Sequence, residues 1–202
     1  EFGKTIEADL SRRDFTINAM ALELTTDEPT FIDLYNGVDD LQGKLIKTPG
    51  KPEDSFSDDP LRMMRAARFM SQLNFTIDPA VIAAIKSMTA RLEIISAERI
   101  RDEFIKIIMS DNPRLGITLL VETGLADIFL PEIPKLKLEI DEHHHHKDVY
   151  EHTLTVLEQA IALEERLGGP NLTLRLAALL HDIGKPKTKE LIAGGGVSFH
   201  HH

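Results

Sequence analysis

The sequence predicts an α+β protein that is mostly α-helical. Two short runs near the start, "NAMALEL" and "TFIDLY", are rich in apolar and β-branched residues over lengths typical of strands. From Pro60 onward, apolar residues recur at helical spacing almost throughout. The apolar fraction of 42% is sufficient for a packed core.

Composition excludes several classes of protein. The 202 residues contain no cysteine, which excludes disulfides and thiolate metal sites and suits a reducing, cytoplasmic location. No apolar run approaches the ~18 residues that a membrane span needs, and no secretory signal opens the chain. The formal net charge of −10 means that any nucleic acid must be bound by local arginine clusters.

The elements follow in order. Asn36-Gly37 supplies a turn after the two strands, within a mixed α/β region at residues 1–48. The next helices open on the capping residues Asp59, Asp78, Ser96 and Asn112, and Gly124 is a candidate C-cap. The two prolines in Leu130 to Lys137 are expected to end this helical array, and two further helices are expected over Val149 to Leu167 and Leu172 to Asp182.

The stretch "SDDPLRMMRAARF" combines a helix start with a row of arginines. Asp59-Pro60 predicts an N-cap followed by a proline at the first helical position. At 100° per residue, Arg62, Arg65 and Arg68 span an arc of about 120°, away from the Met63 stripe. One interpretation is an amphipathic helix with a solvated basic face.

A second interpretation assigns this helix a role in reading nucleobases. A carboxylate such as Asp59 only accepts hydrogen bonds, and a guanidinium such as Arg62 only donates them. Side by side they match an amino donor next to a ring acceptor, which adenine and cytosine present and guanine and uracil do not. Arg65 and Arg68 would then hold phosphates through forked donors.

Histidines form a second constellation. His152 lies on a predicted helix, and His181-Asp182 closes the next one, where imidazole and carboxylate can share a divalent ion. The alternative is that these are ordinary core or surface residues. The run 143–146 could add ligands or be a flexible interdomain segment, and the final histidines could be native or part of a tag.

Four motifs occur in an order that resembles bacterial tRNA nucleotidyltransferases (CCA-adding enzymes) and related poly(A) polymerases. They are "DLSRRDFTINAMAL", "DLYNGVDDLQGKLI", "DDPLRMMRAARF" and "ISAERIRDEF". The resemblance covers nearly the whole chain. It implies the remnant of a nucleotidyltransferase head at residues 1–48, a helical, RNA-binding neck at 49–138 and a partial all-α HD domain at 139–202.

The resemblance also implies roles for single residues. Arg12, Arg13 and Asp14 match a segment that contacts the ribose and phosphates of the incoming nucleotide, and we single out Arg13 and Asp14. Asp59 and Arg62 match the amino-acid template that selects CTP and ATP, while Asp58 replaces a glutamate of the family motif. The remaining nucleotide-binding residues implied are Arg65 and Arg68. "SAERIRDEF" matches a neck helix with a scaffolding role.

The C-terminal part resembles the HD-domain metal-dependent phosphohydrolases. Their pattern is His, then His-Asp, then a later Asp, and His152, His181 and Asp182 fill the first three places. No Asp follows Asp182 in this sequence, so the last ligand would lie beyond His202 or be absent. Some members instead have a further His after a Phe, as in "SFHHH", and for that place the resemblance implies His202. The resemblance implies a divalent metal without giving its identity.

Nucleotidyl transfer in this family needs a glycine-rich loop and an Asp-x-Asp pair that binds Mg²⁺. Neither precedes Arg12, so we expect the chain to be a fragment with no catalytic residue for transfer and the Mg²⁺ ligands outside it. Glu139 and Asp141 have the right spacing, but they are interpreted as a solvated edge.

Three functions are considered. The first is an RNA 3′-end nucleotidyltransferase that adds CCA to tRNA from CTP and ATP. The second is an HD-domain phosphohydrolase or phosphodiesterase, and the third is a helical binding module without chemistry. The motifs do not distinguish CCA from CC, A or poly(A) addition, and they do not give the oligomeric state.

Overall fold

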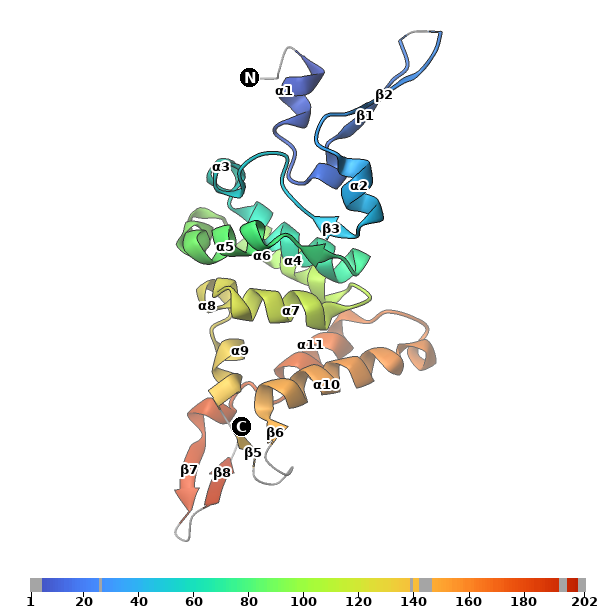
Figure 1. Cartoon of the computed structure of the whole chain (residues 1–202). Coiled ribbons are helices and arrows are strands. Elements are labelled where there is room, and N and C mark those ends of the chain that lie inside the picture. The colour runs from blue at the N-terminus through green and yellow to red at the C-terminus, as the bar shows by residue number, and fades with distance from the viewer. Residues whose placement is uncertain (1–4, 26, 139, 142–146, 193–195, 200–202) are drawn as a thin grey trace.

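The elements follow one another along an elongated molecule in nearly the order of the chain (Figure 1). This computed structural model describes residues 5–25, 27–138, 140–141, 147–192 and 196–199. Its first elements form a small mixed α/β region, and helices make up most of the remaining chain. The mostly helical α+β class predicted from the sequence is confirmed.

The two strands predicted near the start are present. Met20 pairs with Asp33 and Glu23 with Thr30 in an antiparallel ladder. Thr5 caps the preceding helix by accepting a hydrogen bond from the Ala8 N–H. The elements of this part are α1 (Ile6–Leu10), the 3₁₀ turn η1 (Thr16–Asn18), β1 (Met20–Glu23), β2 (Thr30–Asp33) and α2 (Gly37–Gln42).

The predicted turn at Asn36-Gly37 starts the helix α2. Asn36 adopts a left-handed conformation with φ 57°, and the Asp33 carboxylate accepts hydrogen bonds from the Gly37 N–H at 2.7 Å and the Val38 N–H at 3.0 Å. A Cβ at Gly37 would fall against the Thr16 carbonyl oxygen and 2.9 Å from Met20 Cγ, so this position requires glycine.

The central part of the chain is helical around a two-residue parallel ladder in which β3 pairs with β4. Helix α4 packs against both α6 and α7. Its first residue is Leu61, with Pro60 as the flanking residue, one position later than predicted. The elements are β3 (Leu45–Ile46), α3 (Pro52–Asp58), α4 (Leu61–Leu73), β4 (Thr76–Ile77), α5 (Pro79–Met88), η2 (Thr89–Ile94), α6 (Ala97–Ile108), α7 (Pro113–Glu122) and α8 (Leu125–Phe129).

Gly124 and the proline-containing segment 130–137 were both predicted to mark the end of helical structure. Gly124 adopts φ 81° immediately after the α7 cap, as expected of a residue that ends a helix. The segment 130–137 ends the helical array about as predicted, since strand β5 (Ile140–Asp141) follows, but its prolines do not stop the chain's helical path at once: Pro131 precedes a short helix and Pro134 lies within it. This segment forms α9 (Glu132–Lys135) and the 3₁₀ turn η3 (Leu136–Leu138).

The last part contains the two further helices that the sequence predicts. Asp148 caps α10 by accepting from the Tyr150 N–H, and Asn171 caps α11 by accepting from the Leu174 N–H. Two antiparallel strand pairs accompany them. The elements are β5 (Ile140–Asp141), β6 (Lys147–Asp148), α10 (Val149–Ala162), η5 (Glu164–Leu167), α11 (Leu172–Leu180), η6 (Lys185–Lys187), β7 (Lys189–Ile192) and β8 (Gly196–Phe199).

A buried arginine joins this last part to the central helices. Arg175 on α11 is 3% exposed and donates hydrogen bonds to both carboxylate oxygens of Glu164, at 2.7 and 2.6 Å. It also donates to the carbonyl oxygens of Ile108 and Ser110, both at 2.7 Å, where α6 ends. The guanidinium therefore satisfies carbonyls that the end of a helix leaves without partners.

One continuous core runs through these parts. The buried cluster includes Phe15 before η1, Met63 on α4, Ile107 on α6 and Leu179 on α11. Within the part of the chain that the structure describes, no helix is long and apolar enough to cross a membrane.

Candidate nucleotide-binding and metal sites

Charged residues from three segments surround a cavity of about 470 Å³. The segments are residues 12–18, residues 59–65 and helix α6. The cavity is lined by Arg12, Arg13, Asp14, Asn18, Asp59, Leu61, Arg62, Arg65 and Arg99. It thus brings together five of the six residues that the sequence assigned to nucleotide binding, which come from positions far apart in the chain.

Asp59 is held in place from two sides. Its Oδ1 accepts a hydrogen bond at 3.1 Å from the N–H of Leu61, the first residue of α4. Its Oδ2 accepts from the Arg99 guanidinium at 3.0 Å. The side chain remains 32% exposed, and carboxylate oxygens have about four acceptor sites, so capacity for a further donor remains.

Arg62 lines the same cavity and is held by other groups. Its guanidinium donates to Ser55 Oγ at 2.9 Å and to the carbonyl oxygen of Arg12. Asp59 and Arg62 therefore bind neighbouring groups rather than each other, and both reach the cavity instead of being sealed beneath the core. One acceptor and one donor are available at its wall.

Asp14 and Arg65 connect the first part of the chain to α4. Arg65 donates two hydrogen bonds to Asp14 Oδ2, one of them at 2.8 Å. Asp14 is 7% exposed, and its Oδ1 accepts from the Phe15 N–H at 2.9 Å and from Asn18 at 3.1 Å. Asp14 therefore fixes the orientation of Arg65. Arg13 is exposed and pairs with Asp9 at 2.6 Å.

Arg68 differs from the expectation. It is 9% exposed, pairs with Glu103 at 3.3 Å, and lies over the Phe69 ring with its guanidinium carbon 4.5 Å from the centroid. Burial lowers the pKa of Arg68, while Glu103 opposes that change. The predicted solvated basic face is wrong at this position because α6 covers it, and Arg68 does not line the cavity.

Four residues of the cavity wall were not singled out from the sequence: Arg12, Asn18, Leu61 and Arg99. Arg12 contributes its backbone carbonyl, Asn18 binds Asp14, and Arg99 binds Asp59. "SAERIRDEF" was assigned only a scaffolding role. The acidic partner of Arg99 lies 40 positions away and becomes apparent only when α6 is seen to pack on α4.

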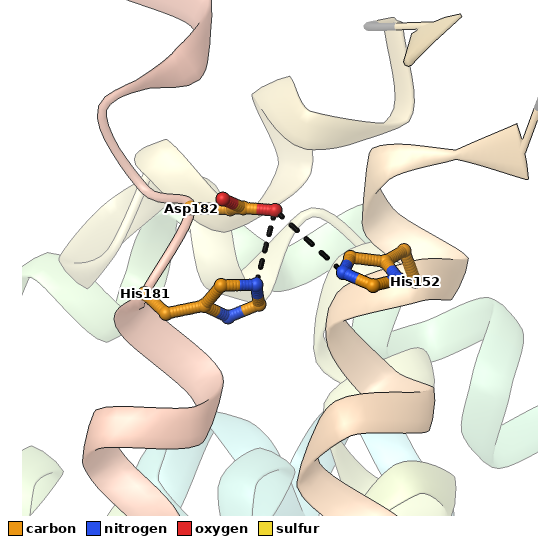
Figure 2. A group of neighbouring side chains, drawn as sticks. All are labelled: His152, His181 and Asp182. Carbon is orange, nitrogen blue, oxygen red and sulfur yellow. Dashed lines mark ion pairs between the residues drawn. The ribbon is translucent and has the colours of Figure 1, made fainter. Parts of the chain in front are cut away.

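The predicted histidine constellation also comes together. Figure 2 shows His152 on α10 facing His181 and Asp182, which follow directly after α11. Asp182 Oδ2 lies 3.1 Å from His181 Nε2 and 3.9 Å from His152 Nε2. One ligand atom from each of the three residues lies within 4.8 Å of the others.

The donor set fits a divalent metal. His181 Nδ1 lies 2.8 Å from the Ala178 carbonyl oxygen and so carries the proton in the neutral ring. Its Nε2 lone pair then faces Asp182, and two imidazole nitrogens with one carboxylate suit first-row divalent ions. His202, Glu139 and the run 143–146 lie outside the described residues, and the same holds for the side chain of Asp141.

Three protein-family models match successive parts of the chain. Residues 1–47 match the poly(A) polymerase head domain, and residues 149–202 match the HD domain. Residues 74–136 match the model described as a probable RNA and SrmB-binding site of polymerase A. The three parts thus match, in chain order, a poly(A) polymerase-type head, an RNA-binding region and an HD domain.

Curated relatives are nucleotidyltransferases. The chain is 38% identical over 188 residues to the A-adding tRNA nucleotidyltransferase of Deinococcus radiodurans, covering 91% of this chain and 42% of that protein. It is 47% identical over 124 residues to the CCA-adding enzyme of Limosilactobacillus reuteri, covering 61% of this chain and 30% of the relative. The chain therefore spans less than half the length of these relatives.

Solved structures of CCA-adding enzymes are also similar to this chain. The CCA-adding enzyme of Bacillus stearothermophilus in complex with CTP is 30% identical, with a TM-score of 0.63 over 92% of this chain and 46% of that one. The Thermotoga maritima CCA-adding enzyme complexed with tRNA is 28% identical, with a TM-score of 0.64 over 87% and 41%. The chain belongs to the bacterial tRNA nucleotidyltransferase and poly(A) polymerase family.

Proposed function

We propose that this chain acts in an enzyme that adds nucleotides to the 3′ end of RNA, with CCA addition to tRNA as the reaction. The observation that carries the proposal is the charged cavity, where Arg13, Asp14, Asp59, Arg62 and Arg65 meet. The names of the relatives and structural neighbours, which include complexes with CTP and tRNA, support the same reaction.

Asp59 and Arg62 would select the base. Asp59 can accept from an exocyclic amino group, and Arg62 can donate to the adjacent ring nitrogen. Cytosine and adenine satisfy both contacts, whereas uracil and guanine present a carbonyl to Asp59 and a ring N–H to Arg62. Each mismatch would leave a polar group without its partner in a partly enclosed site, which is where discrimination is strongest.

Arg13 and Arg65 would hold the sugar and phosphates of the incoming nucleotide. A guanidinium binds phosphate through two parallel donors, and Asp14 fixes the plane of Arg65. In the reaction, the RNA 3′-hydroxyl attacks the α-phosphate and pyrophosphate leaves. Mg²⁺ would supply charge stabilisation and alignment for this step, and we assign none of its ligands to the residues of this chain.

The domain ranges belong to the same proposal. We propose residues 1–48 as part of the catalytic head, 49–138 as the neck that binds nucleotide and RNA, and 139–202 as HD domain. The absence of cysteine favours a reducing compartment, and we propose the cytoplasm.

Incorporation assays test this function. The full-length protein should add C and A to a tRNA substrate that lacks its 3′ CCA, and Arg65→Ala should lower kcat/KM by about 100-fold because a phosphate contact is lost. Arg101→Ala is the matched control, since this arginine is 63% exposed on α6 and pairs with its neighbour Asp102. Failure of the wild-type protein to extend any RNA would reject the proposal.

A second activity is favoured by the His152, His181 and Asp182 cluster. We propose that these residues, with His202, bind a divalent metal in an HD phosphohydrolase site that acts on phosphate esters or RNA 3′ ends. Metal-dependent hydrolysis of 2′,3′-cyclic nucleotides that is lost in His181→Ala is the expected result. Hydrolysis that is equal in His181→Ala and wild type would exclude this cluster as its source.

A further inference from the structure

A buried lysine shares the carboxylate of the proposed metal site. Lys185 is 7% exposed, and its Nζ lies 2.9 Å from Asp182 Oδ2. The same oxygen lies 3.1 Å from His181 Nε2. We propose that Lys185 is an internal cation that competes with the divalent metal for Asp182 and thereby sets the metal affinity of the site.

The local backbone directs the lysine to this oxygen. Lys185 opens the 3₁₀ turn η6, and its N–H donates to the Asp182 carbonyl at 3.0 Å. Residues three apart in such a turn lie above one another, so the ammonium returns to the Asp182 side chain. Lys187, at the other end of η6, is exposed and provides a matched lysine outside the site.

Electrostatics makes the two cations competitors. Asp182 is 3% exposed, and a buried carboxylate needs a compensating charge. Either the ammonium or a metal can provide it, but both on one oxygen would place like charges within a few ångströms in a medium that screens them poorly. Metal binding must therefore displace Lys185 or bear its repulsion, and either outcome lowers the affinity.

This inference rests on the proposed metal site, and the test separates the two. Mn²⁺ binding to the 202-residue chain is measured by isothermal titration calorimetry, because Mn²⁺ binds stretches of histidine more weakly than later first-row ions do. Binding that disappears in His181→Ala defines the site. We expect Lys185→Met to raise the Mn²⁺ affinity of this His181-dependent site by about tenfold or more, whereas Lys187→Met leaves that affinity unchanged.

A second measurement does not depend on metal. In EDTA, Lys185→Met should lower the melting temperature because Asp182 loses its buried partner, and Asp182→Asn added to Lys185→Met should recover part of the loss. Added Mn²⁺ should then stabilise Lys185→Met more than wild type.

The outcomes are distinct. An equal or weaker affinity in Lys185→Met, with His181-dependent binding intact in wild type, overturns the competition and keeps the metal site. Absence of His181-dependent binding in every variant overturns both. Conservative Lys185→Arg should retain the low affinity of wild type, because it retains the positive charge.

Discussion

Replacing Arg175 by alanine tests how the last part of the chain is fixed to the central helices. The substitution removes a guanidinium that is 3% exposed and bonds Glu164 and the carbonyl oxygens of Ile108 and Ser110. Glu164 is 5% exposed and keeps the Asn171 N–H as a donor at 2.8 Å, but it loses its counter-charge. Removing one partner of a buried ion pair costs about 3–5 kcal/mol.

The two freed carbonyls at the end of α6 add to this cost, and water entering the space left by the side chain offsets part of it. We therefore expect a loss of about 4 kcal/mol in the free energy of unfolding. For a chain of this size, each kcal/mol lowers the melting temperature by about 2–4 °C, so the total decrease is about 10 °C.

The assay is thermal unfolding of the 202-residue chain, followed by circular dichroism and calorimetry. Arg166→Ala is the matched control, because Arg166 is exposed on η5 and its removal should stay within about 0.5 kcal/mol. Adding Glu164→Gln to Arg175→Ala should restore part of the stability, since the unpaired buried charge is gone. If Arg175→Ala destabilises the chain no more than Arg166→Ala does, the packing of α11 against the end of α6 does not depend on this arginine.

Single contacts give three further predictions. Hydrogen bonds from Arg175 lower the pKa of Glu164 from its ordinary value of 4.5, so this stabilisation is complete above about pH 4.5 and is lost as the pH falls through the lowered value. The difference in unfolding free energy between wild type and Arg175→Ala should shrink in acid, and a constant difference would contradict this. Gly37→Ala should cost about 1–3 kcal/mol in urea unfolding because its Cβ meets the Thr16 carbonyl oxygen, whereas Gly50→Ala, which meets nothing within 4 Å, should not. Arg99→Met in the full-length protein should lower the kcat/KM preference for CTP over UTP about fivefold by releasing one Asp59 oxygen, and an unchanged preference would exclude a positioning role.

Local signals predicted much of the fold. Of the predicted capping residues, Asp78 accepts the expected backbone hydrogen bond at the start of α5. Ser96 and Asn112 stand at the starts of α6 and α7 as predicted, but without a side-chain cap hydrogen bond. Prolines marked the end of the array only approximately, because Pro131 caps the short helix α9 and Pro134 lies within it, and the array ends only after η3. Periodicity alone cannot distinguish a proline that starts a helix from one that ends it.

The site was predictable where a motif is local and not where partners are distant. Asp59 and Arg62 were named from one short segment, and both line the cavity. Arg68 was placed on a solvated face because the helical arc does not show that α6 covers it with Glu103. Arg99 and Lys185 were missed because each acts through a carboxylate whose burial and neighbours are set by packing.

Base selection by Arg62 is the most direct test of the proposed function. The measurement compares kcat/KM for CTP, ATP, UTP and GTP incorporation by full-length wild type, Arg62→Ala and the control Arg101→Ala. We predict that Arg62→Ala loses at least about 100-fold of the preference for CTP and ATP, while the control keeps it. An Arg62→Ala enzyme that still prefers CTP and ATP over UTP as strongly as wild type would contradict the assignment of this cavity to base selection.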